Sequence, residues 1–109
     1  MPHDEGLAET VRADLDHLPD LREIRMFGGL CFTTAGHMVC GLTGDGGLYR
    51  VGKDGQEAAL ALPDVTPAIM GGRRMGSYVR AGPEAMADDD TRATLTGMAL
   101  RLVAALPPK

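Results

Sequence analysis

The stretch from residue 25 to residue 42, RMFGGLCFTTAGHMVCGL, constrains the fold of this chain more than any other. Apolar residues run through it on both sides of Ala35-Gly36, a pair that suits a two-residue turn, so the sequence predicts a β-hairpin. A two-residue turn would place Cys31 directly opposite Cys40, whereas a three-residue loop with Gly36 in the left-handed conformation would break this pairing. Both registers are compatible with the sequence.

Two consecutive glycines, Gly28 and Gly29, interrupt the first half of this stretch. A dinucleotide-binding loop needs the spacing GxGxxG, and a P-loop needs GxxxxGK followed by serine or threonine; the glycines here fit neither pattern. Glycine inside a strand is typical of a β-bulge or of a close approach between two backbones. We therefore expect one of these glycines at a bulge or against a neighbouring backbone, and no phosphate site.

Helices are predicted at both ends of the chain. Leucine and valine recur at helical spacing before Pro19, and the stretch from residue 83 to residue 106 is helical in pattern, with an aspartate of the segment ADDD as its N-cap. The residues expected in the core from these two helices are Leu7, Val11, Leu15, Leu95, Met98 and Leu102.

The middle of the chain reads as strands and turns. After the opening stretch comes LYRVG, then a short helix in DGQEAALALP that Pro63 ends, then two strands around Gly71-Gly72. The predicted order is α-β-β-β-α-β-β-α, in which short connections favour antiparallel pairing. We predict one domain over residues 1–109, of α+β class, with a two-layer arrangement and an antiparallel sheet of about five strands.

Composition and motif spacing exclude several classes of function. The net charge of −4 opposes a general nucleic-acid surface, so nucleic acid is a doubtful partner, and neither a membrane span nor a signal peptide is predicted. The location expected is therefore the cytoplasm, where the two cysteines would stay reduced. Histidine and cysteine have no metal-binding spacing, and no nucleophile–base motif is present, so we expect no metal, no cofactor and no catalysis.

Arginine side chains are the remaining candidates for a binding site. Several of them fall on predicted strands or in the last hairpin, where they could converge into a contact for an anion or a partner, or could be solvated edge and turn charges. These candidates are Arg25, Arg50, Arg73, Arg74 and Arg80.

Both faces of the predicted hairpin are apolar. With a two-residue turn, Cys31, Met38, Cys40 and Leu42 would share one face with Phe27, and Leu30, Phe32 and Val39 would share the other face with Met26. Helices cover only one side of a two-layer domain, so a second apolar face needs another cover. We therefore expect a homodimer formed partly through the sheet.

The motif RMFGG, followed by the hairpin glycine and by LYRV, resembles the N-terminal domain of the TfoX/Sxy family of bacterial competence regulators. The later segment MGSYV and the closing LPP agree in spacing, so the resemblance covers nearly the whole chain. The matching motif residues are Arg25, Met26, Phe27, Gly28, Gly29, Gly36, Leu48 and Tyr49.

This resemblance implies an α+β domain, a part in the transcriptional regulation of DNA uptake, and no catalytic residues. Two functions follow as expectations. The first is a non-enzymatic protein-interaction or regulatory module, and the alternative is a domain that binds a small anionic ligand or nucleic acid through its surface arginines.

Overall fold

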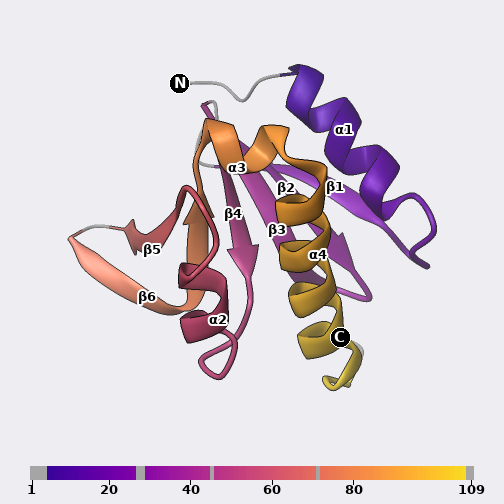
Figure 1. Cartoon of the computed structure of the whole chain (residues 1–109). Helices are drawn as coiled ribbons and strands as arrows, with labels where there is room; N and C mark the ends of the chain where they lie inside the picture. The colour runs from indigo at the N-terminus through magenta and orange to yellow at the C-terminus, as the bar shows by residue number, and fades with distance from the viewer. Residues whose placement is uncertain (1–4, 27–28, 45, 71, 108–109) are drawn as a thin grey trace.

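The computed structural model describes residues 5–26, 29–44, 46–70 and 72–107 of the chain. Its helices and strands follow one another as shown in Figure 1. In chain order they are α1 (Glu5–Leu15), β1 (Arg22–Met26), β2 (Gly29–Thr34), β3 (His37–Thr43), β4 (Gly46–Arg50), α2 (Gln56–Leu60), β5 (Val65–Met70), β6 (Arg73–Ala81), α3 (Pro83–Ala87) and α4 (Asp89–Ala104).

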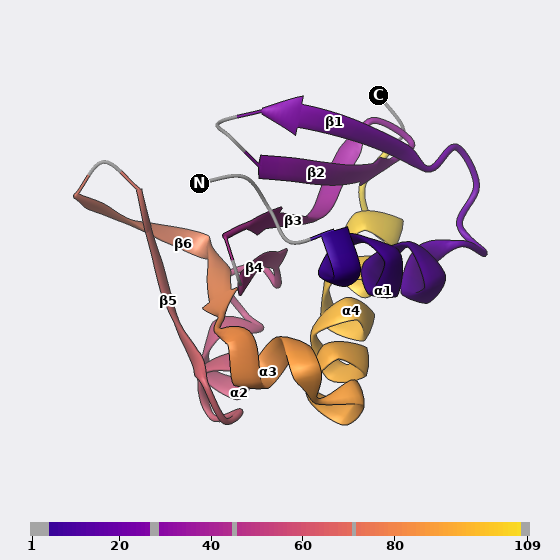
Figure 2. The ribbon, with the colours of Figure 1, turned by 90° about the horizontal axis from the view of Figure 1, so that it is seen from above.

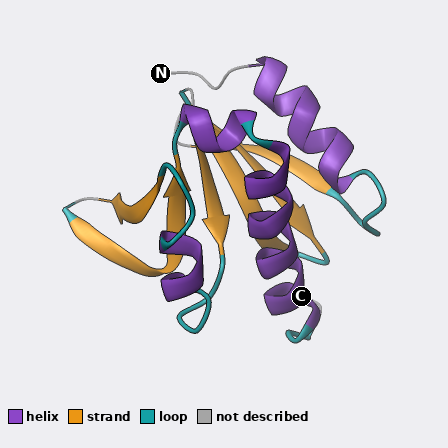
Figure 3. Ribbon diagram, in the orientation of Figure 1, coloured by secondary structure: helices purple, strands orange, loops and turns teal. Residues whose placement is uncertain are grey.

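The described strands form one antiparallel sheet in the order β1-β2-β3-β4-β6-β5. Figures 2 and 3 show the helices gathered on one side of this curved sheet, and α4 contacts both β3 and β4. The predicted α+β class and antiparallel sheet are confirmed. The sheet has six strands because the segment RMFGGL is divided between β1 and β2, which pair with each other from Met26 and Gly29 onward.

The core lies between the sheet and the helices. Tyr49, Phe32, Leu15, Leu42, Met86 and Leu95 are its largest fully buried side chains. Val11, Leu15 and Leu95 are buried as predicted, but Leu7, Met98 and Leu102 are only partly buried. The reason in α4 is that its buried stripe runs through Leu95, Ala99 and Val103, so Leu102 turns toward the loop at Gly52.

The β2–β3 hairpin has the predicted two-residue turn but not the predicted register beyond it. Ala35 and Gly36 have φ angles of 51° and 83°, as a type I′ turn requires. A bulge then leaves Val39 as an extra residue, so Phe32 faces Cys40 and Cys31 faces Gly41. The expected Cys31–Cys40 pair is therefore wrong, because the bulge moves the two free cysteines to opposite faces of the sheet.

The same bulge corrects the predicted faces of the hairpin. Leu30, Phe32 and Val39 lie in the core beneath the helices, and Cys40 and Leu42 join them there instead of lying on the other face. Cys31 and Met38 remain on the side of the sheet without helices. The positions of Phe27 and Gly28 lie outside the described residues.

Gly29 confirms the expected close approach between backbones. It starts β2 beside the end of β3, where a Cβ atom would overlap the carbonyl oxygen of Leu42 and would lie 2.7 Å from Cγ2 of Thr43. Only a residue without a side chain fits there without displacing β3. The glycine therefore serves the fit of the two strands.

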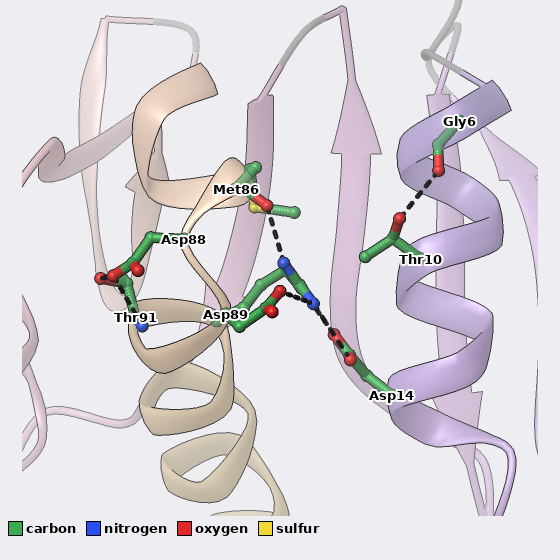
Figure 4. A network of polar contacts seen from close by, with 8 residues as sticks. Gly6, Thr10, Asp14, Met86, Asp88, Asp89 and Thr91 are labelled. Atoms are coloured by element: carbon green, nitrogen blue, oxygen red, sulfur yellow. Dashed lines mark hydrogen bonds and ion pairs between the residues drawn. The ribbon is translucent and has the colours of Figure 1, made fainter.

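A polar network fixes the helices over their face of the sheet (Figure 4). Arg92 of α4 donates from Nε to Asp14 of α1 at 2.8 Å, from Nη1 to the carbonyl of Met86 at 3.0 Å and from Nη2 to Asp89 at 3.0 Å. An aspartate of the segment ADDD caps α4 as predicted: it is Asp88, which accepts from the backbone N–H of Thr91 at 3.1 Å. One face of the sheet is thereby held under α1, α3 and α4.

Candidate functional site

The face of the sheet opposite the helices, called here the helix-free face, is defined by one row of residues that crosses all the strands. Registers of the neighbouring strands place these residues side by side, and alternation along each strand keeps them on one face. From β1 across to β5, the row consists of Ile24, Cys31, Gly41, Leu48, Arg80 and Thr66.

A hollow of about 260 Å³ lies on the helix-free face. Its floor includes Gly41, where a Cβ atom would come within 3.1 Å of Cε of Met38 and 3.6 Å of Sγ of Cys31. The absence of a side chain at Gly41 thus leaves room between these two neighbours. Apart from Arg80, the side chains that line the hollow are mainly apolar, among them Cys31, Met38, Leu48, Ile69, Met75 and Tyr78.

The rim of the hollow is held by contacts along β6. The Tyr78 hydroxyl donates to Sδ of Met38 at 3.8 Å, and Nη1 of Arg80 donates to the Thr43 hydroxyl at 3.5 Å. On the backbone side, the carbonyl of Tyr78 accepts a hydrogen bond of 2.8 Å from Nε2 of Gln56, a buried residue of α2. The helix α2 therefore fixes the strand that carries both Tyr78 and Arg80.

The five candidate arginines are distributed over several places in the fold. Arg50 faces Tyr78 across the β4–β6 pair, so it shares the helix-free face with Arg80. Arg25 lies on β1 opposite Leu30, and therefore on the side of the sheet that carries the helices. The other two, Arg73 and Arg74, begin β6, and Nη2 of Arg74 donates to Oε1 of Gln56 at 3.0 Å. The fold thus brings together Arg50 and Arg80 only.

The motif residues serve mostly the fold. Gly36 forms the hairpin turn, Gly29 permits the contact with β3, and Tyr49 is buried in the core, where burial raises the pKa of its hydroxyl. Met26 is the β1 partner of Gly29. Among the described motif residues, Leu48 and Gly29 line the hollow, and of these two only Leu48 has a side chain.

Sequence reasoning missed most of the hollow. Met38, Met75 and Tyr78 were not named as site residues, although Leu48 in LYRV and Tyr78 in SYVR alternate with buried positions. That alternation signals an apolar residue on the second face of each strand. Their convergence depends on the β4–β6 pairing, which a local pattern does not show.

Burial determines the chemistry of the thiols. It raises the pKa of Cys31, and it raises the pKa of Cys40 still more, with a further contribution from the charge of Asp14. Both thiols are therefore protonated at neutral pH and are weak nucleophiles. No group of three or more histidine, cysteine, aspartate or glutamate side chains suited to a metal ion occurs within the described ranges.

The fold and the site define a small α+β domain with an apolar hollow on its helix-free face. Residues 13–102 match the family model described as the TfoX N-terminal domain, which covers most of the chain. The chain therefore belongs to the TfoX N-terminal domain family and is a competence-regulator-like module. Searches of the curated proteins and of the solved structures found no match. Among the helices that the structure describes, none is long and apolar enough to cross a membrane.

Proposed function

We propose that this domain is a non-enzymatic protein-interaction module of a regulatory kind, and that its partner binds on the helix-free face. The observation that carries the proposal is the apolar hollow that this face presents. The other face of the sheet is covered by the helices, so this recess is where an apolar surface is exposed. An exposed apolar recess is the type of surface that binds an apolar side chain of another protein. The raised pKa of the Cys31 thiol adds support, because the thiol that lines the hollow is protonated at neutral pH and is a weak nucleophile.

The charges around the hollow indicate the chemistry of this partner. Arg80 lines the hollow, and Arg50 lies on the same face beside Tyr78. A partner segment with one apolar anchor and a neighbouring carboxylate would fit the recess and place its negative charge near these guanidinium groups. The chain as a whole is acidic, with a net charge of −4, so these two arginines oppose the overall charge of the protein.

The test is a quantitative affinity capture from a lysate of the source cells. The tagged chain is compared with Leu48→Glu, which puts a charge into the hollow, and with Ala93→Glu, which puts the same charge on an exposed position of α4. We expect a partner protein that is captured by the original chain and by Ala93→Glu. The amount of this protein captured by Leu48→Glu should be at least about tenfold lower. A protein retained equally by all three chains would contradict the proposal.

A second candidate is the binding of a small anion or a single nucleic-acid strand by Arg50 and Arg80. Their shared face favours it, with Tyr78 between them as a surface on which a base could stack. Fluorescence anisotropy of a labelled oligonucleotide at rising salt tests this candidate. Binding that weakens with salt and is lost in Arg80→Gln, but kept in Arg73→Gln, would support it over a protein partner.

A further inference from the structure

The two outer edges of the sheet differ in their protection against pairing with another chain. At one edge, β5 carries Pro67, which has no N–H to donate, and a bulge between Pro67 and Ile69. At the other edge, β1 pairs with β2 over its full length without a shift in register and contains no proline. Figure 2 shows β1 at the outer margin of the sheet, with β2 along one side of it. An edge strand of this kind leaves every second N–H and C=O unpaired on its outer side.

The charged residues of β1 determine in which register a second strand can pair with it. Its sequence, Arg-Glu-Ile-Arg-Met over residues 22–26, can meet a second copy of itself in antiparallel fashion around a two-fold axis. An axis at Glu23 would place two glutamates opposite each other, and an axis at Arg25 would place two arginines opposite each other. Only an axis at Ile24 pairs Glu23 of each copy with Arg25 of the other, and it leaves no like charges directly opposite.

The positions of Glu23, Ile24 and Arg25 in the monomer are compatible with this register. Glu23 is held by Arg12 of α1 through two hydrogen bonds of 2.7 and 2.8 Å, which fix its carboxylate on the side of β1 that carries the helices. Arg25 is exposed and forms no ion pair with the described residues. On the helix-free face, Ile24 is 43% exposed, which is unusual for a large apolar side chain in this domain.

We propose that two copies of this chain associate by antiparallel pairing of β1 with β1 around Ile24, which joins their sheets into one. Ile24 of each copy then covers Ile24 of the other, and Glu23 of each copy bonds Arg25 of the other beside Arg12. This homodimer uses the edge of the sheet in place of the apolar face, so it leaves the hollow open and is independent of the proposed function. A pair of five-residue strands covers less than the roughly 1,200 Å² of a standard interface, so we expect dissociation in the micromolar range.

Cross-linking at the symmetry axis tests the register. Ile24→Cys is made together with Cys31→Ala, because Cys31 is the β2 neighbour of Ile24 and its thiol would otherwise compete. Residues that face each other across the axis lie within disulfide distance, so mild oxidation should give a covalent dimer by intact mass. Ile69→Cys in the same background is the control, because Ile69 is 68% exposed and lies on β5.

A dimer from the Ile24→Cys chain in clear excess over the control supports the pairing. An Ile24→Cys chain that stays monomeric, or a control that cross-links to the same extent, overturns it. Circular dichroism of both variants verifies that each is folded before oxidation.

Charge reversal tests the pairing without a covalent bond. Glu23→Arg and Arg25→Glu each place like charges opposite one another, so sedimentation should show each variant about tenfold weaker in self-association than the original chain. An equimolar mixture of the two variants restores opposite charges at both contacts and should form a heterodimer. If the mixture contains only monomers, the proposal is overturned. The same holds if the original chain still sediments as a monomer at concentrations up to about 100 µM.

Discussion

Gly29 has no room for a side chain, and this property can be measured against another glycine of the same sheet. We predict that Gly29→Ala lowers the free energy of unfolding by about 1–3 kcal/mol, because its Cβ would overlap the backbone of β3. Gly41→Ala is the matched control, because its nearest atom is Cε of Met38, the movable end of a flexible side chain at 3.1 Å. Denaturant unfolding of both variants gives the comparison, and equal stabilities would contradict the assigned contact.

Asp88 is a residue whose contribution depends on pH. The hydroxyl and backbone N–H of Thr91 lower its pKa below the ordinary value of 3.8, since they bond the carboxylate form. The stabilisation is therefore complete above pH 3.8 and is lost as the pH falls through the lower, folded-state value.

We predict that Asp88→Asn loses less stability than the original chain over this acid range, because an amide caps the helix without titrating. Thermal melts at pH 7 and at pH values below 3.8 test the difference. If both chains lose the same stability between neutral and acid pH, then carboxylates other than Asp88 determine the acid sensitivity.

At the scale of the elements, α4 carries the buried stripe that closes the core. We predict that Leu95→Ala lowers the free energy of unfolding by about 2–5 kcal/mol, because Leu95 is fully buried and its loss leaves a cavity. Leu102→Ala should cost less than about 2 kcal/mol, because this side chain is partly exposed beside Gly52. Chemical denaturation of the two variants decides between this stripe and one that runs through Leu102.

The elements that sequence predicts well here are those with local signals. Asp88 caps the start of α4, and Ala35-Gly36 forms a two-residue turn. Both features depend on neighbouring residues alone, so the sequence predicts them without knowledge of the tertiary structure. The bulge at Val39 has no such signal, because it arises from the fit of two strands to a curved sheet. That one extra residue changed the predicted partner of Cys31 and the face of Cys40.

At the scale of the whole molecule, the candidate site was harder to predict than the fold. The fold follows from helical periodicity at the ends of the chain and turn signals between them. The hollow requires that β4 and β6 pair so that Leu48 and Tyr78 lie near each other on one face, and that residues of β2 and β5 also line it. Such contacts between distant segments depend on topology, which apolar alternation alone does not specify.

The sheet, finally, separates the two cysteines chemically as well as spatially. Cys31 lines the hollow and is 9% exposed, whereas Cys40 is 1% exposed in the core. The folded chain thus contains a natural single-site reporter: a small maleimide should modify Cys31 slowly and leave Cys40 unmodified until the protein unfolds. Mass spectrometry of the peptides over time measures both rates. A partner that fills the hollow should slow the first rate, so labelling can detect its occupant without any engineered probe.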